Sequence, residues 1–205
     1  MKKILIFLFL ASNIFLKISH VYSNTIVLSP GESIQAAIDK AKNGDMITLR
    51  EGKYIINQGL VIRNKQKLKI QSVGPVQIIS THYASPVISL HNSHLVILQE
   101  CEFRYQNPGK AKAAGVIVFQ NTIRCAVISC DISNGLNGIH AVNNKILALI
   151  QNNIHHNQKT GIYLSGSHGV LVQNNTVSDN GKGLEKINVT DLDLKNNDIR
   201  DNRSQ

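Results

Sequence analysis

The sequence has no tryptophan, and aromatic residues make up only 5% of the chain. Any hydrophobic core built from this composition must therefore be aliphatic. Charged residues are also scarce, at 17%, whereas 42% of the residues are hydrophobic, and this balance excludes an intrinsically disordered chain. Apart from one stretch at the N-terminus, no apolar run is long enough to cross a bilayer. With 205 residues the chain has room for one domain, or at most two small ones.

Asparagine is abundant, with 22 residues in the chain. So many asparagines argue against a helix bundle, because their side chains compete with helical hydrogen bonds. The formal net charge of +9 is compatible with an acidic polymer as a partner without requiring one. No arginine-rich run with interleaved aromatics occurs, so we expect no nucleic-acid partner.

The N-terminus has the pattern of a secretory signal peptide. Lys2 and Lys3 precede an apolar run over residues 4–16, and Val21-Tyr22-Ser23 is similar to a cleavage site. We therefore predict a signal peptide over 1–23, a mature domain over 24–205, and a secreted or periplasmic protein. No transmembrane span is expected after cleavage. An uncleaved N-terminal membrane anchor is the alternative.

The rest of the chain repeats itself every 22 or 23 residues. The frame Asn-x-(Ile/Val)-x-x-Asn occurs over 152–157, 175–180 and 197–202. Three further columns share this period. They are a second-asparagine column (Asn134, Asn157, Asn180, Asn202), a glycine column (Gly115, Gly138, Gly161, Gly183) and an apolar column (Cys125, Leu147, Val170, Leu192).

This repeat predicts an all-β solenoid, with one coil per repeat. Alternating apolar and polar residues, as in Val170-x-Val172, indicate short strands with one face inward. Asparagine and glycine between the strands suit turns, and stacked asparagines can satisfy one another. The leucine-rich frame Leu-x-x-Leu-x-Leu is absent. We therefore predict a parallel β-helix whose regular coils cover about 115–202.

The N-terminal part of the domain predicts a cap. Ser29, Pro30 and Glu32 are typical of a helix start, and apolar residues at helical spacing follow up to Ala41. We expect a short capping helix over 30–42 that covers the open end of the solenoid. Strands are expected at 46–49, 54–56, 60–62, 68–70, 76–79, 87–90 and 95–98, and a basic loop at 110–114.

The motifs Ser33-Ile34-Gln35-Ala36-Ala37-Ile38 and Asn43-Gly44-Asp45 resemble the opening of secreted right-handed parallel β-helix proteins of the pectin-lyase-like group. This group includes pectate lyases, mannuronan epimerases and carbohydrate-binding β-helix repeat proteins. The resemblance covers nearly all of the mature chain. It implies the fold, with a carbohydrate, usually an acidic polysaccharide, bound along one outward sheet face.

The sequence also departs from the enzymes of this group. The Asp-Pro-His-Asp motif of the epimerases is absent, and Asp191 and Asp193 have no obvious partners for a calcium cluster. We therefore predict no metal-ligating residues and leave the cofactor unknown, with Ca²⁺ an open alternative. No C-terminal cap is visible, so end-to-end oligomers, a trimmed gene or a sufficient polar tail are the alternatives.

Outward residues at equivalent positions of successive coils should form a line of candidate catalytic residues. After the glycine column this line contains Ile117, His140, Tyr163 and Glu185, about 5 Å apart. His140 could accept a proton, Tyr163 could donate one, Glu185 could orient them, and Lys182 could neutralise a sugar carboxylate. An ordinary solvated sheet face is the alternative.

Further residues are candidates for binding the substrate around this line: Asn137, Lys186, Arg124, Lys110 and Lys112. His155 and His156 are adjacent, and in an extended segment their side chains would point in opposite directions. We therefore expect an exposed pair in a turn rather than a joint metal site.

The three cysteines leave two alternatives. Cys101 and Cys130 occupy the first-asparagine position of the repeat, so neighbouring coils would bring them within reach of a disulfide. The other interpretation is that Cys101, Cys125 and Cys130 are all buried thiols of the core.

Two functions therefore remain open from the sequence. The first is a lyase or epimerase that abstracts a proton next to the carboxylate of a uronate. The second is a non-catalytic β-helix that binds a glycan or serves as a structural surface protein. The fold alone does not decide between them.

Overall fold

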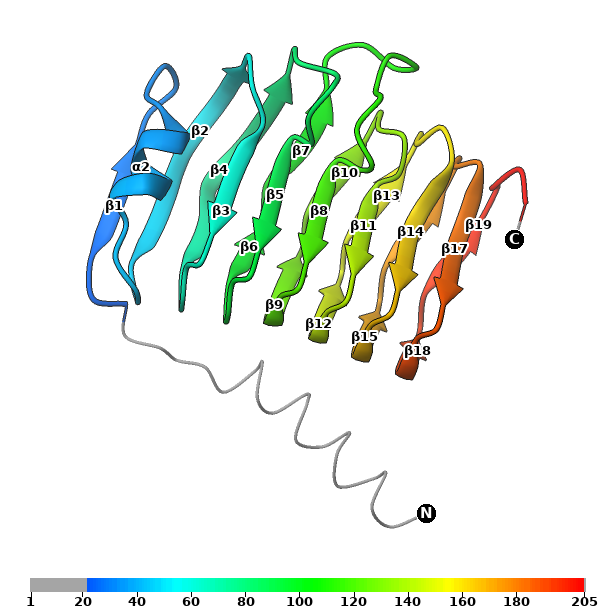
Figure 1. Cartoon of the computed structure of the whole chain (residues 1–205). Coiled ribbons are helices and arrows are strands. Elements are labelled where there is room, and N and C mark those ends of the chain that lie inside the picture. Colours follow the sequence, from blue (N-terminus) through cyan, green and yellow to red (C-terminus); the bar gives the residue numbers. More distant parts are fainter. Residues whose placement is uncertain (1–21, 205) are drawn as a thin grey trace.

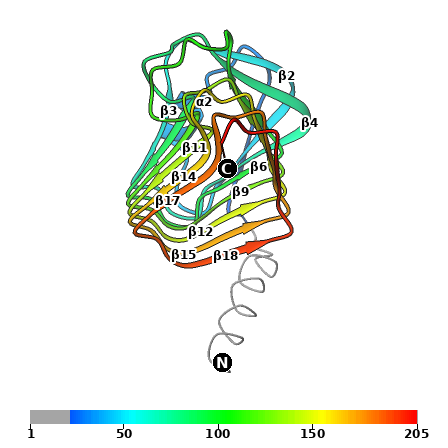
Figure 2. The same cartoon turned by 90° about the vertical axis from the view of Figure 1, so that its right-hand side faces the viewer.

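The structure, a computed structural model, describes residues 22–204, so the predicted signal peptide over 1–23 lies almost entirely outside the described residues. The described chain forms a β-solenoid in which successive coils stack from the N-terminal cap toward the C-terminus (Figure 1). Every strand pair in its two sheets is parallel, as the repeat predicts. Viewed along the axis, the coils lie one behind another (Figure 2). In the described residues no helix is long and apolar enough to span a membrane.

From β5 onward, each coil contributes one strand to each of three faces. We call the six-stranded sheet β17-β14-β11-β8-β5-β3 the β11 sheet. The 13-stranded sheet contains two lines of strands, the β9 line (β6, β9, β12, β15, β18) and the β10 line (β7, β10, β13, β16, β19). They meet at β4, whose first half pairs with β6 and whose second half pairs with β7.

The bounds of the elements follow the repeat closely from β8 onward. In chain order the elements are β1 (Thr25–Leu28), α2 (Ile34–Lys40), β2 (Met46–Ile56), β3 (Leu60–Arg63), β4 (Lys69–Ser80), β5 (Ile88–His91), β6 (Ile97–Gln99), β7 (Glu102–Tyr105), β8 (Ile117–Gln120), β9 (Ile123–Ile128), β10 (Asp131–Ser133), β11 (Ile139–Val142), β12 (Lys145–Ile150), β13 (Asn153–His155), β14 (Thr160–Ser165), β15 (His168–Gln173), β16 (Thr176–Ser178), β17 (Lys182–Ile187), β18 (Thr190–Lys195) and β19 (Asp198–Arg200).

The capping helix is shorter than the sequence suggests. It begins at Ile34, because Ser33 is the N-cap and its Oγ accepts a hydrogen bond from the backbone N–H of Ala36 at 3.1 Å. Gly31 lies at φ 96°, which a right-handed helix cannot contain, so the expected start at Pro30 is wrong. Glu32 still bonds the backbone N–H of Ser29, but within a turn that precedes the helix.

Two pairs of predicted strands are single long strands. β2 joins the segments expected at 46–49 and 54–56, and β4 joins those expected at 68–70 and 76–79. Gly52, at φ 136°, marks a register shift between β2 and β4 instead of a break. The loop expected around 110–114 is confirmed, since no regular structure occurs between β7 and β8.

The core is a stack of aliphatic columns inside the coils. Cys125, Leu147, Val170 and Leu192 are strand partners in successive coils, which confirms the predicted apolar column. The largest fully buried side chains include Tyr105, Phe103 and Phe119 near the loop between β7 and β8.

Buried asparagines connect the coils at their corners. Asn175 Oδ1 accepts hydrogen bonds from the backbone N–H and the side-chain amide of Asn152, both at 2.9 Å, and Asn197 does the same for Asn175. A second ladder runs through Asn157, Asn180 and Asn202. These ladders confirm the expected stacking.

Two predicted columns are displaced by one residue in the first regular coil. Gly135, not Asn134, donates its backbone N–H to Asn157 Oδ1, so Asn134 lies outside the ladder. Likewise Ile117 pairs with Ile139, which leaves Gly115 one position away from Gly138 in register. The structural partners Ile117 and Ile139, and likewise Gly135 and Asn157, are 22 residues apart, whereas the predicted columns assumed a spacing of 23 here.

The cysteines are free and buried, which agrees with the core interpretation. Cys101 and Cys130 lie in adjacent coils, because the residues that follow them, Glu102 and Asp131, are strand partners. Burial raises the pKa of the Cys130 thiol to about 12 and holds that of Cys101 well above its ordinary value. We therefore expect both thiols to stay protonated and to react slowly in the folded protein.

Candidate functional site

The predicted catalytic line lies on the outward face of the β11 sheet. His140, Tyr163 and Glu185 are strand partners in three successive coils. Ile117 does not belong to this line, because it pairs with Ile139 and is buried in the core. Val118 takes its place beside His140.

The geometry within this line is that of a stack. The rings of His140 and Tyr163 lie 4.7 Å apart between centroids and are nearly parallel, at 5°. The two rings therefore face each other in a stack, and the imidazole and the phenol form no hydrogen bond with each other. His140 Nδ1 is buried and has no hydrogen-bond partner, and burial lowers the pKa of this imidazole. Glu185 Oε2 accepts a hydrogen bond from Thr160 Oγ1 at 3.2 Å.

The expected binding residues are distributed over several places. Lys182 is the strand partner of Thr160, beside Glu185, whereas Lys186 is the partner of the inward-facing Leu164. Asn137 is buried, and its amide bonds the carbonyl of Ala114 and the backbone N–H of Thr160. Its side chain therefore holds the corner of the coil and is not free on the surface.

The basic residues lie at the two ends of β8. Lys110 and Lys112 are exposed in the loop that precedes this strand, and Arg124 is exposed in β9, which follows it. The loop contacts the next coil toward the C-terminus through a hydrogen bond from Gln158 Nε2 to the carbonyl of Ala111 at 3.4 Å. Gln158 follows His156 by two residues, and His156 belongs to a second polar cluster.

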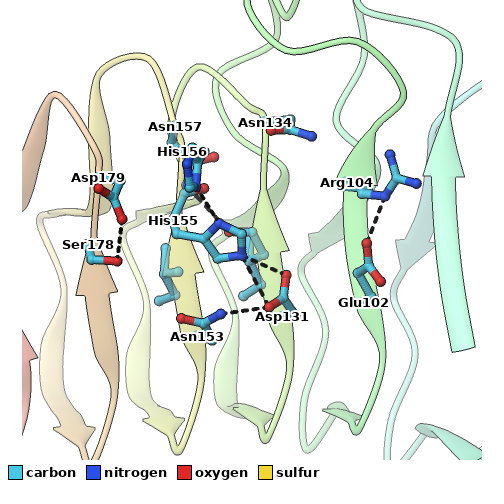
Figure 3. Close-up of polar contacts among 12 residues, drawn as sticks. Glu102, Arg104, Asp131, Asn134, Asn153, His155, His156, Asn157, Ser178 and Asp179 are labelled. Atoms are coloured by element: carbon cyan, nitrogen blue, oxygen red, sulfur yellow. Dashed lines mark hydrogen bonds and ion pairs between the residues drawn. The ribbon is translucent and has the colours of Figure 1, made fainter. Parts of the chain in front are cut away.

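This second cluster lies on the outward face of the β10 line (Figure 3). Strand pairing aligns Glu102 with Asp131 and Asn153, and aligns Arg104 with Ser133 and His155. Because alternate residues of a strand face the same side, these positions form two adjacent rows on one surface. We call the surface formed by Glu102, Arg104, Asp131, Asn153, His155, His156, Ser178 and Asp179 the β10 face.

A continuous chain of polar contacts crosses the centre of the β10 face. His155 Nε2 lies 3.0 Å from Asp131 Oδ1 and 3.2 Å from its Oδ2, and Asn153 donates to Oδ2 at 2.7 Å. On the other edge of the same ring, His155 Nδ1 lies 2.7 Å from His156 Nδ1. Asp131, His155 and His156 are therefore joined as carboxylate, imidazole and imidazole.

The contacts shift the pKa values of the inner pair in opposite directions. The hydrogen bond that His155 donates to Asp131 raises the pKa of His155 above 6.5, against the effect of burial, and the charges of Asp131, Asp179 and Glu102 raise it further. For Asp131, burial acts to raise the pKa, but the hydrogen bonds from His155 and Asn153 prevail and lower it below 3.8. Both shifts favour the charged pair.

The expectation that His155 and His156 point in opposite directions is wrong. His156 follows the last residue of β13 and has φ 54°, so the chain turns and brings the two rings edge to face at 4.9 Å between centroids. A signal for this was present in the sequence. Asn134, His156, Asp179 and Asp201 recur with the repeat, and all have positive φ. Asparagine, aspartate and histidine are the residues that tolerate this conformation best.

The other carboxylates of the β10 face are compensated locally. Glu102 contacts Arg104 Nε at 2.7 Å and accepts a hydrogen bond from Gln77 at 2.7 Å, and Asp179 accepts one from Ser178 at 2.9 Å. Among the described residues, no group of three or more histidines, cysteines, aspartates or glutamates is arranged to hold a metal ion.

A groove of about 420 Å³ borders this cluster on the N-terminal side. Its polar lining includes Lys53, Gln77 and four carboxylates, those of Glu51, Glu100, Glu102 and Asp131. Glu102 and Asp131 belong both to the groove and to the β10 face, so the groove adjoins the carboxylate that contacts His155.

Parallel coils, inward aliphatic columns and corner asparagine ladders define this chain as a parallel β-helix protein. The sequence model of the family described as right handed beta helix region matches residues 86–205, and the chain belongs to this family. The expected handedness and the resemblance to the pectin-lyase-like group are thereby confirmed.

Three solved structures illustrate the similarity of fold. A candidate glycosyl hydrolase from Parabacteroides merdae has a TM-score of 0.68 and 11% identity, over 84% of this chain and 94% of that one. An alginate lyase from a Paenibacillus species has a TM-score of 0.64 and 14% identity, over 85% and 76%. A pectate lyase has a TM-score of 0.53 and 12% identity, over 80% and 56%. No curated protein matches the sequence significantly.

Proposed function

We propose that this chain is an exported, carbohydrate-active β-helix protein that binds a polysaccharide across the β10 face and acts on it by proton transfer. The observation that carries the proposal is the chain of contacts from Asp131 through His155 to His156, open to solvent at its outer end. A positioned imidazole held by a carboxylate is a common general base. The groove beside Asp131 offers an adjoining place for sugar units.

The similar structures support the substrate class. Their names describe a glycosyl hydrolase, an alginate lyase and a pectate lyase, which are proteins that act on carbohydrates. Fold similarity at this identity does not carry an activity over to another chain, so we infer the activity from the residues of the site. A predicted signal peptide over 1–23 agrees with a role outside the cytoplasm, in the periplasm or beyond.

We propose an acidic polysaccharide rather than a neutral one. Lys110 and Lys112 are exposed in the loop that bonds Gln158, close in sequence to His156, and Arg104 lies on the β10 face itself. Meanwhile Glu102 contacts the guanidinium of Arg104 and Asp131 contacts the imidazole of His155, which reduces the repulsion of a polyanion by these two carboxylates. Proton abstraction next to a uronate carboxylate, as in a lyase or epimerase, is the reaction that this setting suits.

A second candidate surface for the same class of substrate is the outward face of the β11 sheet. The specific observation in its favour is His140 Nδ1, a buried nitrogen without a partner in a ring with lowered pKa. There His140, Tyr163, Glu185 and Lys182 would be catalytic, with Arg124 at the start of β9 next to the polymer, whereas Lys186 is in register with the inward-facing Leu164 and would not bind it. The flat stack of His140 on Tyr163 is the reason that we rank this face second.

A non-catalytic glycan-binding or structural role is the remaining alternative. In that role the polar residues on the outer faces would bind the glycan, and no side chain would have to accept a proton. The difference between the two roles can be measured directly.

The test is turnover of acidic and neutral polysaccharides by the mature chain beginning at Asn24. Both the ultraviolet absorbance of unsaturated products and the release of reducing ends would be followed. Our proposal predicts activity on a uronate polymer that His155→Gln lowers by about two orders of magnitude or more. His168→Gln is the matched control, because His168 is exposed and bonds only Thr190 and Asp191 among the described residues.

Each alternative predicts a different result. Loss of activity in His140→Ala and Tyr163→Phe, with His155→Gln unaffected, would move the site to the β11 sheet. Binding of a polymer without turnover or proton exchange would establish the non-catalytic role. Neither binding nor turnover with any polysaccharide would contradict the proposal as a whole.

A further inference from the structure

The contact between the two histidine rings restricts where their protons can be. Two imidazole nitrogens 2.7 Å apart can form a hydrogen bond only if one carries a proton and the other presents a lone pair. The rings meet nearly perpendicularly, at 87°, so this is an edge contact and not a stack.

The carboxylate at the other end determines the direction of the bond. Ionised Asp131 can only accept, so His155 Nε2 must donate to it. In neutral His155, Nδ1 then presents a lone pair, and His156 Nδ1 must be the donor. The remaining nitrogen of the pair, His156 Nε2, is left with a free lone pair on an exposed side chain.

We propose that His156 Nε2 is the proton acceptor of the β10 face and that Asp131 and His155 are positioning residues that hold it in this tautomer. The inference rests on the proposed function and names its reacting atom. On proton abstraction from a substrate C–H bond next to a carboxylate, the electron pair stays on the substrate as an enolate and the proton binds His156 Nε2. The Nδ1 proton of His156 can then move to His155 Nδ1, which leaves an imidazolium beside the Asp131 carboxylate.

The same chain of contacts reverses when His155 is protonated. An imidazolium donates from both nitrogens, so His156 Nδ1 becomes the acceptor and His156 Nε2 then carries the proton. The charged groups that face this pair are Asp131 from β10, Glu102 and Arg104 from β7, and Asp179 after β16. Because Asp131 raises the pKa of His155 above 6.5, we expect the arrangement with neutral His155 and a lone pair on His156 Nε2 only at pH values above that raised pKa.

The direct test is NMR of the imidazole nitrogens in isotope-labelled mature protein, without any substrate. Above the pKa of His155 the proposal predicts that His155 carries its proton on Nε2 and that His156 carries its proton on Nδ1. Asp131→Ala should shift His156 toward the Nε2–H tautomer. Asp198→Ala is the matched control, because this aspartate lies on the same line of strands and bonds only Arg200 among the described residues.

An Nε2–H tautomer of His156 in the unmodified protein at high pH would overturn the inference. So would equal activity of the unmodified protein and His156→Gln on a polysaccharide that His155→Gln no longer turns over. The tautomers can be as predicted even if no polysaccharide is turned over. In that case the proposed function fails while the assignment of the proton-accepting nitrogen stands.

Discussion

At the scale of single residues, one backbone angle creates the candidate site. His156 lies in the left-handed region, at φ 54°, and this turns its ring back onto His155. Strand alternation alone would have separated the two side chains. Sequence periodicity predicts which residues face outward, but it does not show which corner residue leaves the extended conformation. The recurring Asn, His and Asp at this corner were the available clue.

The Asp131–His155 pair should make stability depend on pH in a defined window. The raised pKa of His155 gives a contribution that is complete below 6.5 and is lost as the pH rises through the folded value. The lowered pKa of Asp131 gives one that is present above 3.8 and is lost as the pH falls. The free energy of unfolding should therefore differ most between the unmodified protein and His155→Gln from pH 3.8 to 6.5.

Chemical denaturation at several pH values measures this difference. We expect less than about 1 kcal/mol, because the pair is partly exposed and screened by solvent. A difference that grows above the pKa of His155 would contradict the ion pair. His168→Gln again serves as the control on an exposed histidine.

The buried ladder should be much more sensitive than the surface. In Asn175→Ala, two donors of Asn152 and the carbonyl of Leu149 lose their partner in the interior. We expect a loss of about 2–4 kcal/mol in the free energy of unfolding, since buried unpaired polar groups cost this much. Asn107→Ala, at an exposed loop position, should change it by less than about 0.5 kcal/mol. Similar values for both variants would contradict the ladder.

At the scale of elements, the residues at the corners of the coils determine the fold as much as the residues of the strands do. The sequence predicts the regular strands and their inward columns well, because alternation and a period of 22 or 23 residues act together. It is less informative in β2 and β4, where Gly52 and Gly74 lie inside long strands at positive φ. A glycine in a strand indicates a bulge as readily as a break, and only the pairing of neighbouring coils decides between them.

The glycine column holds two coils in close approach. A Cβ at Gly161 would lie 2.5 Å from Val177 Cγ1 and 2.9 Å from Asn180 Nδ2. Gly161→Ala should therefore destabilise the protein by about 1–3 kcal/mol, as overpacking does in other cores. Gly109→Asn is the control, because this loop glycine has open space and asparagine tolerates its φ of 78°. Thermal unfolding of both variants measures this difference. Equal unfolding temperatures would show that the corner accommodates a methyl group at Gly161.

The loop between β7 and β8 offers a separate test of charge. Lys110→Gln together with Lys112→Gln should weaken the binding of an acidic polysaccharide and reduce its salt dependence, with the fold unchanged. Lys145→Gln, on the exposed start of β12, is the matched control. Equal binding by both variants at low salt would show that the loop lysines do not contact the polymer.

At the scale of the whole molecule, the solenoid encloses its three thiols in one continuous core. Cys101, Cys125 and Cys130 are buried and free, and burial raises the pKa of each. A thiol reagent should therefore react with none of them in the folded protein and with three after denaturation. One reactive thiol after denaturation would instead indicate a disulfide between Cys101 and Cys130.

More of the fold than of the candidate site can be predicted from the sequence. Columns such as Cys125, Leu147 and Val170 are local patterns repeated many times, so small errors at one coil do not change the architecture. A site depends on single displacements, such as the one-residue shift that places Val118 rather than Ile117 beside His140. Charge and residue type indicated the basic loop, but the contact of His155 with Asp131 required the register of β10 and β13.

The most direct measurement of the central claim is an amide NMR titration of the mature protein with oligosaccharides of galacturonate, alginate and a neutral glucan. Our account predicts that an acidic oligosaccharide shifts the resonances of Glu102, Asp131, Asn153 and His155, and leaves His140 and Tyr163 unchanged. Shifts confined to His140, Tyr163 and Glu185 would place the glycan on the β11 sheet instead. No shift on either face with any of the oligosaccharides would contradict the claim that this surface binds carbohydrate.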